Sequence, residues 1–124
     1  KKKWKLVIIG EGEEKKKLLK LAKKINVFKS IIFMGVIKKI DIWYKKAGIF
    51  ILPSRYEGMP NVIIEAMQSK TAIIGSNIPG IKYFAFMGMG KNISISRASG
   101  FIIPKAAKTP IIHPEAPTIL ALYI

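Results

Sequence analysis

The stretch FILPSRYEGMPNVIIEAM, residues 50–67, contains the end of one structural element, a polar loop and the start of another. The apolar run that ends in it is typical of a buried strand, and Pro53 closes that strand because proline cannot donate to a sheet. Apolar residues at helical spacing follow Pro60, and proline is favoured in the first turn of a helix. The stretch therefore predicts a strand over residues 48–54 and a helix over residues 60–69.

Short apolar runs alternate with helical patterns around this stretch. Three further runs are expected to be strands, at residues 6–10, 31–36 and 71–76. Two segments carry apolar residues at helical spacing, at residues 13–25 and 38–47. Apolar strands that alternate with amphipathic helices predict βαβ units, which build a parallel sheet covered on both faces. We therefore expect an α/β fold with a Rossmann-like parallel sheet of four to five strands and flanking helices.

The pattern weakens in the last third of the chain. Residues 77–80 are expected to form a turn, and residues 81–90 are apolar without a clear period. Residues 100–104 are the candidate for a fifth strand. The remaining tail has three prolines in residues 105–124 and an amphipathic face only over 118–123. These features predict a domain core at residues 1–82 and an atypical remainder of the same domain at residues 83–124.

Length and composition limit the class of protein. The chain has 124 residues and is 50% hydrophobic, which suits one domain with its own core. No apolar run reaches the roughly 20 residues needed to cross a bilayer. Cysteine is absent, which excludes disulfides and cysteine metal sites and favours a reducing, cytoplasmic setting.

The net charge of +15 is concentrated at one end of the chain. Residues 1–46 contain 15 lysines and four acidic residues, a net charge of +11. The simplest explanation of this charge is that the lysines lie on solvated helix faces. The functional alternative is attraction to phosphate-bearing substrates or to anionic lipid headgroups on the inner face of the cell membrane. A specific nucleic-acid site is not expected, because the sequence lacks a basic strand interleaved with aromatic residues and has no Cys/His finger spacing.

Two glutamates flank the start of the predicted helix in the opening stretch. Glu57 falls in the loop after the strand, and ligands of parallel sheets bind beyond the carboxyl ends of the strands. Glu65 falls inside the helix and shares a face with Asn61, four residues earlier. Either glutamate alone would suit a helix terminus or a surface ion pair. Together, they offer two carboxylates that can accept hydrogen bonds from sugar hydroxyls.

The backbone between the two glutamates suits an anion. Gly58 allows a ligand to approach the main chain closely. The N–H groups of Met59, Asn61 and Val62 lack helical partners at the start of the helix, where the helix dipole also favours negative charge. A phosphate-binding backbone between two carboxylates indicates a sugar-nucleotide site.

The same stretch resembles glycosyltransferase family 4, whose catalytic domains have the GT-B architecture. The family pattern is a strand ending in Pro-Ser, followed by Glu-Gly-x-Pro-x-x-x-x-Glu-Ala-Met, and residues 53–67 match it as PSRYEGMPNVIIEAM. Flanking pieces agree in order and spacing: VIIGEG at 7–12, IFMGV at 32–36, DIWYKKA at 41–47 and SNIPG at 76–80. The resemblance covers roughly residues 4–82.

This resemblance implies one half of a GT-B fold, the donor-binding domain of a retaining glycosyltransferase. It implies that Glu57 is catalytic and holds hydroxyls of the donor sugar, and that Glu65 grips the ribose. Backbone of the same loop and helix would face the sugar and diphosphate, at Gly58, Met59, Pro60 and Asn61. Gly35 and Val36 would flank the base. Gly10 and Gly12 would form the turn after the first strand, although a plain strand-to-helix turn explains them equally, since the third glycine of a dinucleotide fingerprint is missing.

The resemblance also implies the substrates and partners. The donor would be a UDP- or GDP-sugar, and the reaction would need no metal or other cofactor. Asp41 is the single aspartate, so no Asp-x-Asp pair can hold a cation, and the single histidine, His113, has no companion ligand or triad. The acceptor would be a glycan or lipid-linked glycan of a bacterial polysaccharide, capsule or lipopolysaccharide pathway.

The sequence departs from the family pattern in three places. The Arg and Lys that grip the diphosphate in the family have no counterpart, and Lys70 and Ala72 replace a glycine and a proline. Tyr83 or Phe84 stands where the family has a glutamate. The N-terminal acceptor domain of the family is also missing, so we expect the isolated chain to be inactive. The alternative is a non-catalytic, degenerate sugar-nucleotide fragment or interaction module.

Overall fold

The computed structural model describes residues 4–87, 94–95, 101–103 and 118–122. Its strands are β1 (Lys5–Ile9), β2 (Ile31–Met34), β3 (Ile49–Leu52), β4 (Ala72–Ser76), β5 (Ser94–Ile95), β6 (Phe101–Ile103) and β7 (Thr118–Leu122). Its helices are α1 (Lys15–Lys24), α2 (Asp41–Lys46), α3 (Asn61–Gln68) and α4 (Pro79–Met87), with a short 3₁₀ helix η1 (Phe28–Ser30).

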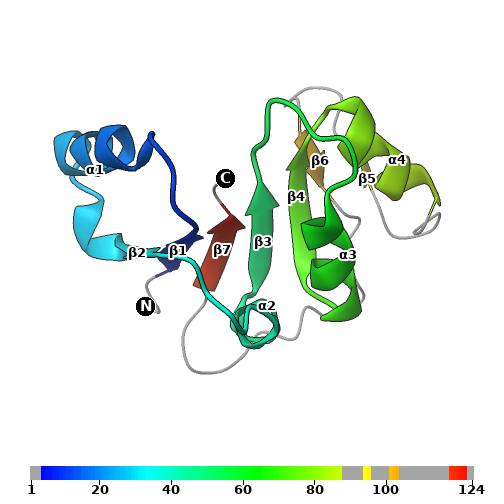
Figure 1. Cartoon of the computed structure of the whole chain (residues 1–124), viewed down its shortest axis with the longest axis horizontal. Coiled ribbons are helices and arrows are strands. Elements are labelled where there is room, and N and C mark those ends of the chain that lie inside the picture. The colour runs from blue at the N-terminus through cyan, green and yellow to red at the C-terminus, as the bar shows by residue number, and fades with distance from the viewer. Residues whose placement is uncertain (1–3, 88–93, 96–100, 104–117, 123–124) are drawn as a thin grey trace.

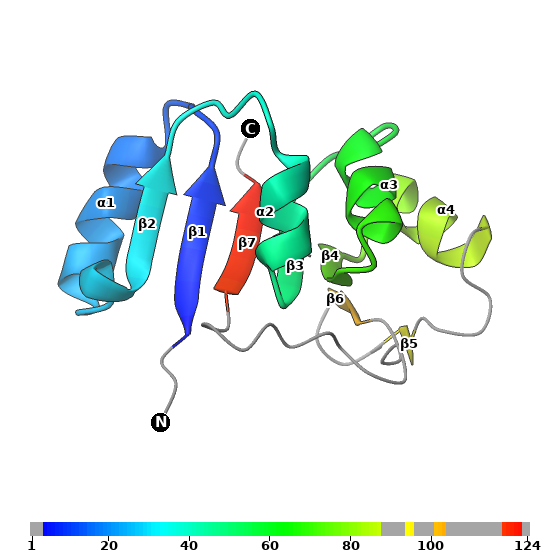
Figure 2. The same cartoon turned by 90° about the horizontal axis from the view of Figure 1, so that it is seen from below.

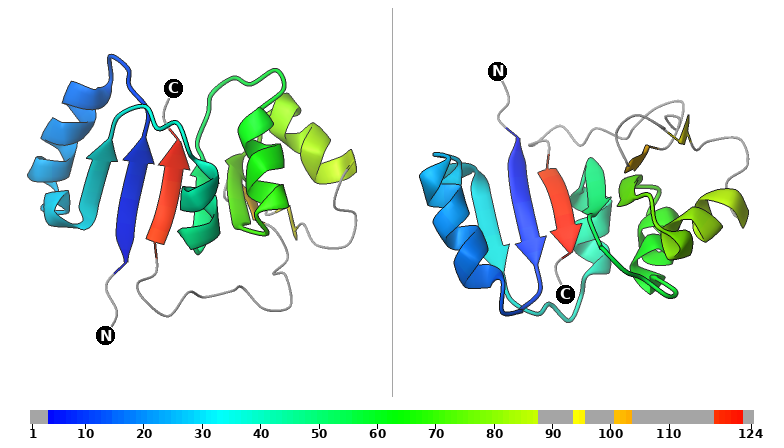
Figure 3. Two further views of the ribbon diagram at one scale, coloured as in Figure 1. Left: turned by 60° about the horizontal axis from the view of Figure 1, so that its bottom comes forward. Right: turned by 90° about the horizontal axis from the view of Figure 1, so that it is seen from above.

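The described strands form one mixed sheet with the order β2-β1-β7-β3-β4-β6-β5. The first five strands in that order are parallel, and β6 and β5 pair antiparallel at one edge. Helix α1 lies on one face of the sheet, while α2 and the neighbouring α3 lie on the other (Figure 3). Helices on both faces are what a parallel sheet requires, because both of its faces are apolar.

The predicted α/β class with a Rossmann-like parallel sheet is confirmed. The four runs expected to be strands in the first 76 residues form β1 to β4, and the three expected helices form α1, α2 and α3. Their ends lie within three residues of the predicted bounds. The candidate fifth strand at residues 100–104 is β6. It runs antiparallel to β4, and β5 and β7 extend the sheet beyond the four to five strands expected.

Two expectations for the chain after residue 76 are wrong. Residues 77–80 are not a simple turn, since α4 begins at Pro79 and continues to Met87, within the segment that lacks a clear period. Ile81 is 3% exposed and Phe84 packs against the core, so this helix forms because tertiary burial, rather than a regular pattern, favours it.

The second correction concerns residues 118–123, where an amphipathic face was expected. The segment instead forms β7, which lies between β1 and β3 (Figure 2). Parallel pairing joins it to β1 from Lys5 to Ile9 and to β3 from Ile49 to Ile51. These pairs satisfy the hydrogen-bonding backbone groups of β1 and β3. The local periodicity of residues 118–123 contains no information on this long-range pairing.

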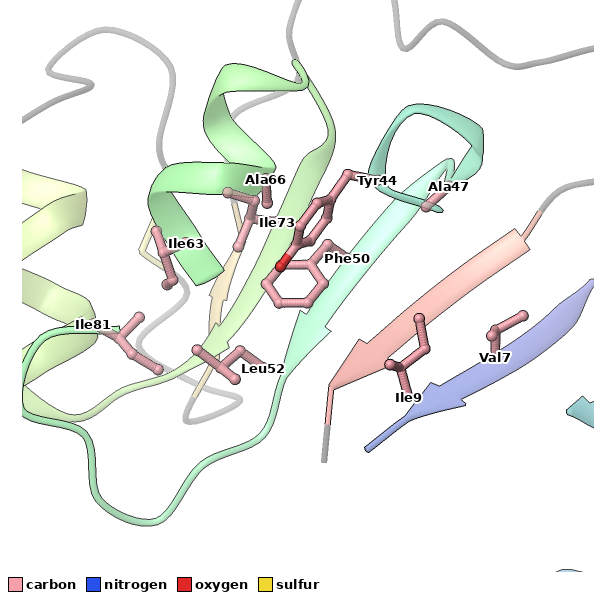
Figure 4. Close-up of a cluster of buried hydrophobic side chains, with 10 residues drawn as sticks. All are labelled: Val7, Ile9, Tyr44, Ala47, Phe50, Leu52, Ile63, Ala66, Ile73 and Ile81. Atoms are coloured by element: carbon pink, nitrogen blue, oxygen red, sulfur yellow. The ribbon is translucent and has the colours of Figure 1, made fainter. Parts of the chain in front are cut away.

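The main core lies between β3, β4 and the helices on their face (Figure 4). Phe50 and Leu52 alternate with half-buried residues along β3 and are 0% and 1% exposed. The Phe50 ring meets the ring of Tyr44 from α2 edge to face, with 5.3 Å between centroids. Ile63 and Ala66 cover the cluster from α3. This core therefore anchors both ends of the loop that joins β3 to α3.

Replacing the central core ring should have a large effect on stability. We predict that Phe50→Ala lowers the free energy of unfolding by about 3–5 kcal/mol, because it removes a fully buried ring and leaves a cavity. Ile32→Ala on the edge strand β2 is the control, since Ile32 is 44% exposed, and should cost less than about 1 kcal/mol. Urea unfolding followed by circular dichroism measures both, and equal losses would contradict this description of the core.

Candidate functional site

The candidate site lies where the parallel strands end. Because β1, β2, β3 and β4, labelled in Figure 1, point the same way, the loops that follow them all emerge at one edge of the sheet (Figure 3, left). Every site residue predicted from the sequence lies in these loops or in the first two turns of α3. The parallel sheet thus places the predicted residues on a common edge, where open α/β sheets bind their ligands.

The loops after β1 and β2 touch each other. The N–H of Gly10 donates a hydrogen bond to the carbonyl oxygen of Gly35, with 3.3 Å between nitrogen and oxygen. Gly10 has a φ of 122°, which favours glycine, and a Cβ on Gly35 would lie 2.9 Å from Oε1 of Glu11. The carbonyl of Gly12 accepts from the N–H of Lys15 at the start of α1. Both glycine-bearing loops are therefore tightly packed, and Val36 is left 78% exposed beside them.

In the loop after β3, a serine holds the glutamate that the sequence singled out. The hydroxyl of Ser54 donates to Oε1 of Glu57, with 2.6 Å between the oxygens. Both residues are half-buried, so the bond fixes the direction of a carboxylate that still reaches solvent. Sequence reasoning missed this role of Ser54, and the three-residue spacing between Ser54 and Glu57 was the available signal.

The same loop rests on the start of α4. A Cβ on Gly80 would lie 2.2 Å from the carbonyl oxygen of Glu57 and 2.7 Å from that of Gly58, so only glycine fits there. A Cβ on Gly58, in contrast, would have no atom within 4 Å. The loop is thus packed against Gly80 but open at Gly58, where a ligand can approach the main chain. Gly80 belongs to the SNIPG motif at residues 76–80 but is not among the site residues that the sequence predicts.

Helix α3 follows directly from this loop. The structure places Pro60 at the N-cap, one residue before the helix, and Pro60 is buried. The N–H of Ile63 donates to the carbonyl of Pro60 at 3.0 Å, which closes the first turn. Met59 and Asn61 are exposed beside it. The N–H groups that precede this first bond lack intrahelical partners and, with the helix dipole, can receive an anion.

Glu65, the second predicted carboxylate, is held by a tyrosine of α2. The hydroxyl of Tyr44 donates to Oε2 of Glu65 at 3.1 Å, and Tyr44 is 1% exposed. Burial, the nearby charge of Glu65 and this hydrogen bond all raise the pKa of Tyr44, so its hydroxyl remains a donor. The hydroxyl of Thr71 in turn donates to the carbonyl of Tyr44 at 2.8 Å. The available sequence signal for this contact was a tyrosine in a short helix that ends in two lysines, and the prediction did not use it.

The described part of the chain contains no group of three or more His, Cys, Asp or Glu side chains placed to hold a metal ion. None of its helices has the length and hydrophobicity that crossing a bilayer requires.

Comparison with known proteins gives a consistent set of relatives. The model of the family described as "Glycosyl transferases group 1" matches residues 1–107. The amylovoran biosynthesis glycosyltransferase AmsD of Erwinia amylovora is 46% identical over 63 residues, which are 51% of this chain and 18% of that protein. The Vi polysaccharide biosynthesis protein VipC/TviE of Salmonella typhi is 32% identical over 100 residues, 81% of this chain and 16% of that protein.

An uncharacterized glycosyltransferase of Haemophilus influenzae is 39% identical over 80 residues, 64% of this chain and 23% of that protein. The matched part of the chain thus spans between 16% and 23% of the length of these three relatives. No solved structure matches the chain.

Substitution by alanine should affect stability differently at Gly58, which lies in the loop, and at Gly80, which packs against it. We predict that Gly80→Ala lowers the free energy of unfolding by about 1–3 kcal/mol, because its Cβ overlaps the backbone of Glu57 and Gly58. Gly58→Ala, which points into open space, should change it by less than about 0.5 kcal/mol. Urea unfolding of the two variants measures this difference. The opposite order of stability would show that the loop does not rest on α4.

Proposed function

Because the chain belongs to the group 1 glycosyl transferases, we propose that it forms the donor-binding part of a retaining transferase of family 4, with the GT-B architecture. In this proposal, the sheet edge binds a nucleotide diphosphate sugar, and the sugar is transferred to a glycan or lipid-linked acceptor. The fold and the family membership support the proposal, and the arrangement of the two glutamates is the observation that carries it.

Glu57 and Glu65 are both held by side-chain hydroxyls, one on each side of the start of α3. Ser54 directs Glu57 at the loop, and Tyr44 directs Glu65 within the helix. In our proposal, Glu57 accepts hydrogen bonds from hydroxyls of the donor sugar, which makes it the catalytic residue, and Glu65 accepts from the ribose diol. Carboxylates fixed before binding lose little entropy when a diol engages them, which favours recognition.

The diphosphate would lie over the backbone between the two glutamates. The N–H groups of the Gly58–Asn61 segment and the dipole of α3 supply the donors that the developing negative charge of a departing diphosphate needs. The base of the nucleotide would contact Gly35 and Val36. The turn from Gly10 to Gly12 would line the same edge of the sheet. No step in this proposal uses a metal or another cofactor.

The whole transferase is a further part of the proposal. The matched segments cover only 16% to 23% of the relatives named above. The names of two of these relatives refer to amylovoran and Vi polysaccharide biosynthesis. We infer a bacterial polysaccharide or lipopolysaccharide pathway and an acceptor-binding partner domain that completes the active site. The 124-residue chain alone should therefore bind nucleotide weakly and transfer no sugar; turnover by the isolated chain would contradict this point.

Contact with an anionic membrane surface, on the inner face of the cell membrane, is also proposed. Five lysines of α1 are exposed, at positions 16, 17, 20, 23 and 24, and Leu21 and Ile25 beside them are 50% and 55% exposed. Exposed apolar side chains among lysines suit a lipid headgroup region. We expect the chain to co-sediment with vesicles containing phosphatidylglycerol at low salt. About 0.5 M salt should release it, because the Debye length then falls to about 4 Å and the charges are screened. Equal binding to neutral vesicles would contradict this expectation.

Nucleotide titration tests the donor site directly. We predict that UDP or GDP binds the chain with a dissociation constant in the range of about 0.1–10 mM, with no change on adding EDTA. Glu65→Ala should lower the affinity for the tighter-binding nucleotide by about tenfold or more, because it removes a charged acceptor of hydrogen bonds from the ribose hydroxyls. Isothermal titration calorimetry or NMR titration measures the affinities.

Glu13→Ala is the matched control, since Glu13 is an exposed glutamate just before α1, and it should leave the affinity unchanged. Absence of binding to both nucleotides at millimolar concentration would instead support the alternative function, a non-catalytic fragment or interaction module. Binding that Glu65→Ala does not weaken would contradict the role assigned to Glu65.

A further inference from the structure

We propose that Tyr44 is a positioning residue for ribose recognition, which acts by holding the carboxylate of Glu65 through one of its two oxygens. This inference rests on the proposed function, since it assigns the ribose of a nucleotide to Glu65. Tyr44 belongs to α2, a different element from the loop and helix that carry the predicted donor-binding motif.

The geometry gives the two carboxylate oxygens of Glu65 different surroundings. Oε2 accepts the hydrogen bond from Tyr44, with 3.1 Å between the oxygens. Among the described residues, no side chain or backbone group donates to Oε1. Glu65 itself is half-buried. One oxygen is therefore anchored inside the protein, and the other remains available to a ligand hydroxyl at the sheet edge.

Tyr44 is itself held by two contacts. The ring of Tyr44 is 1% exposed and packs edge to face on Phe50, at an interplanar angle of 82°. The hydroxyl of Thr71, just before β4, donates to the Tyr44 carbonyl. A tyrosine so buried cannot follow a moving carboxylate, so Glu65 adopts the position that the phenol dictates. Its hydroxyl also stays protonated, because burial and the charge of Glu65 raise the pKa of Tyr44.

Alternative uses of this tyrosine agree less well with the structure. A purely structural role needs only the ring, and a phenylalanine would fill the space beside Phe50 without burying a hydroxyl. A catalytic role would need access to the substrate, which the burial of Tyr44 precludes. Tyr44 differs from an ordinary core residue because its hydroxyl donates a hydrogen bond from α2 to the predicted ligand-binding carboxylate of Glu65 on α3.

The Tyr44→Phe variant removes the hydroxyl and keeps the ring. We expect it to weaken binding of UDP or GDP, whichever binds the wild-type chain more tightly, by about two- to tenfold. The 2′,3′-dideoxy analogue of the same nucleotide lacks the hydroxyls that Glu65 would contact, so its affinity should be the same for the wild type and the variant. Tyr83→Phe on α4 is the matched control, because Tyr83 is 55% exposed, and it should change neither affinity.

A double variant tests whether the effect passes through Glu65. Once Glu65→Ala has removed the carboxylate, adding Tyr44→Phe should cause no further loss of affinity. Thermal unfolding of each variant ensures that the titrations are made on folded protein. A general loosening of the site would lower the affinity for the ribonucleotide and the dideoxy analogue alike, and that outcome would overturn the proposal.

The possible failures are distinguishable. If Glu65→Ala weakens binding but Tyr44→Phe does not, the role of Tyr44 is wrong while the donor site stands. If the wild-type chain binds neither nucleotide, or binds the ribonucleotide and its dideoxy analogue equally well, the assignment of the ribose to Glu65 fails and the role of Tyr44 fails with it.

Discussion

Parallel pairing of the central strands is the constraint on which the site depends. Because β1, β2, β3 and β4 share one direction, the loops after them emerge at one edge of the sheet, although they are far apart in sequence. The buried side chains of β3, Phe50 and Leu52, then fix the strand under α3, so that the loop between them has little freedom. The placement of both glutamates follows from that short, anchored connection.

Much of this arrangement could be predicted from the sequence, because the first 76 residues carry strong local signals. Apolar runs of strand length, helical spacing and Pro60 identify β1 to β4 and α1 to α3. The later elements could not be found in this way. Helix α4 depends on the burial of Ile81, and β7 depends on backbone groups of β1 and β3 that it pairs with. Both are tertiary demands, which a local pattern does not contain.

The candidate site divides in the same manner. The loop and helix that carry Glu57, Gly58 and Glu65 were predicted from one motif, whereas the residues that hold them were not. Tyr44 lies 21 residues before Glu65, and Gly80 lies 22 residues after Gly58. Contacts at such separation arise from the packing of α2 and α4 around the loop, so they become visible only in the folded chain. The preorganised carboxylates are therefore a property of the domain rather than of the motif.

The central claim is that nucleotide binds at the sheet edge over the start of α3. The most direct measurement is the change of backbone amide NMR shifts when UDP or GDP is added to isotope-labelled chain. We predict that the largest changes fall at Gly58, Met59, Asn61 and Val62 and at Gly35 and Val36, with little change along α1. Shifts confined to the lysine-rich α1 would instead mean that the phosphates are attracted by surface charge alone, and would contradict the account.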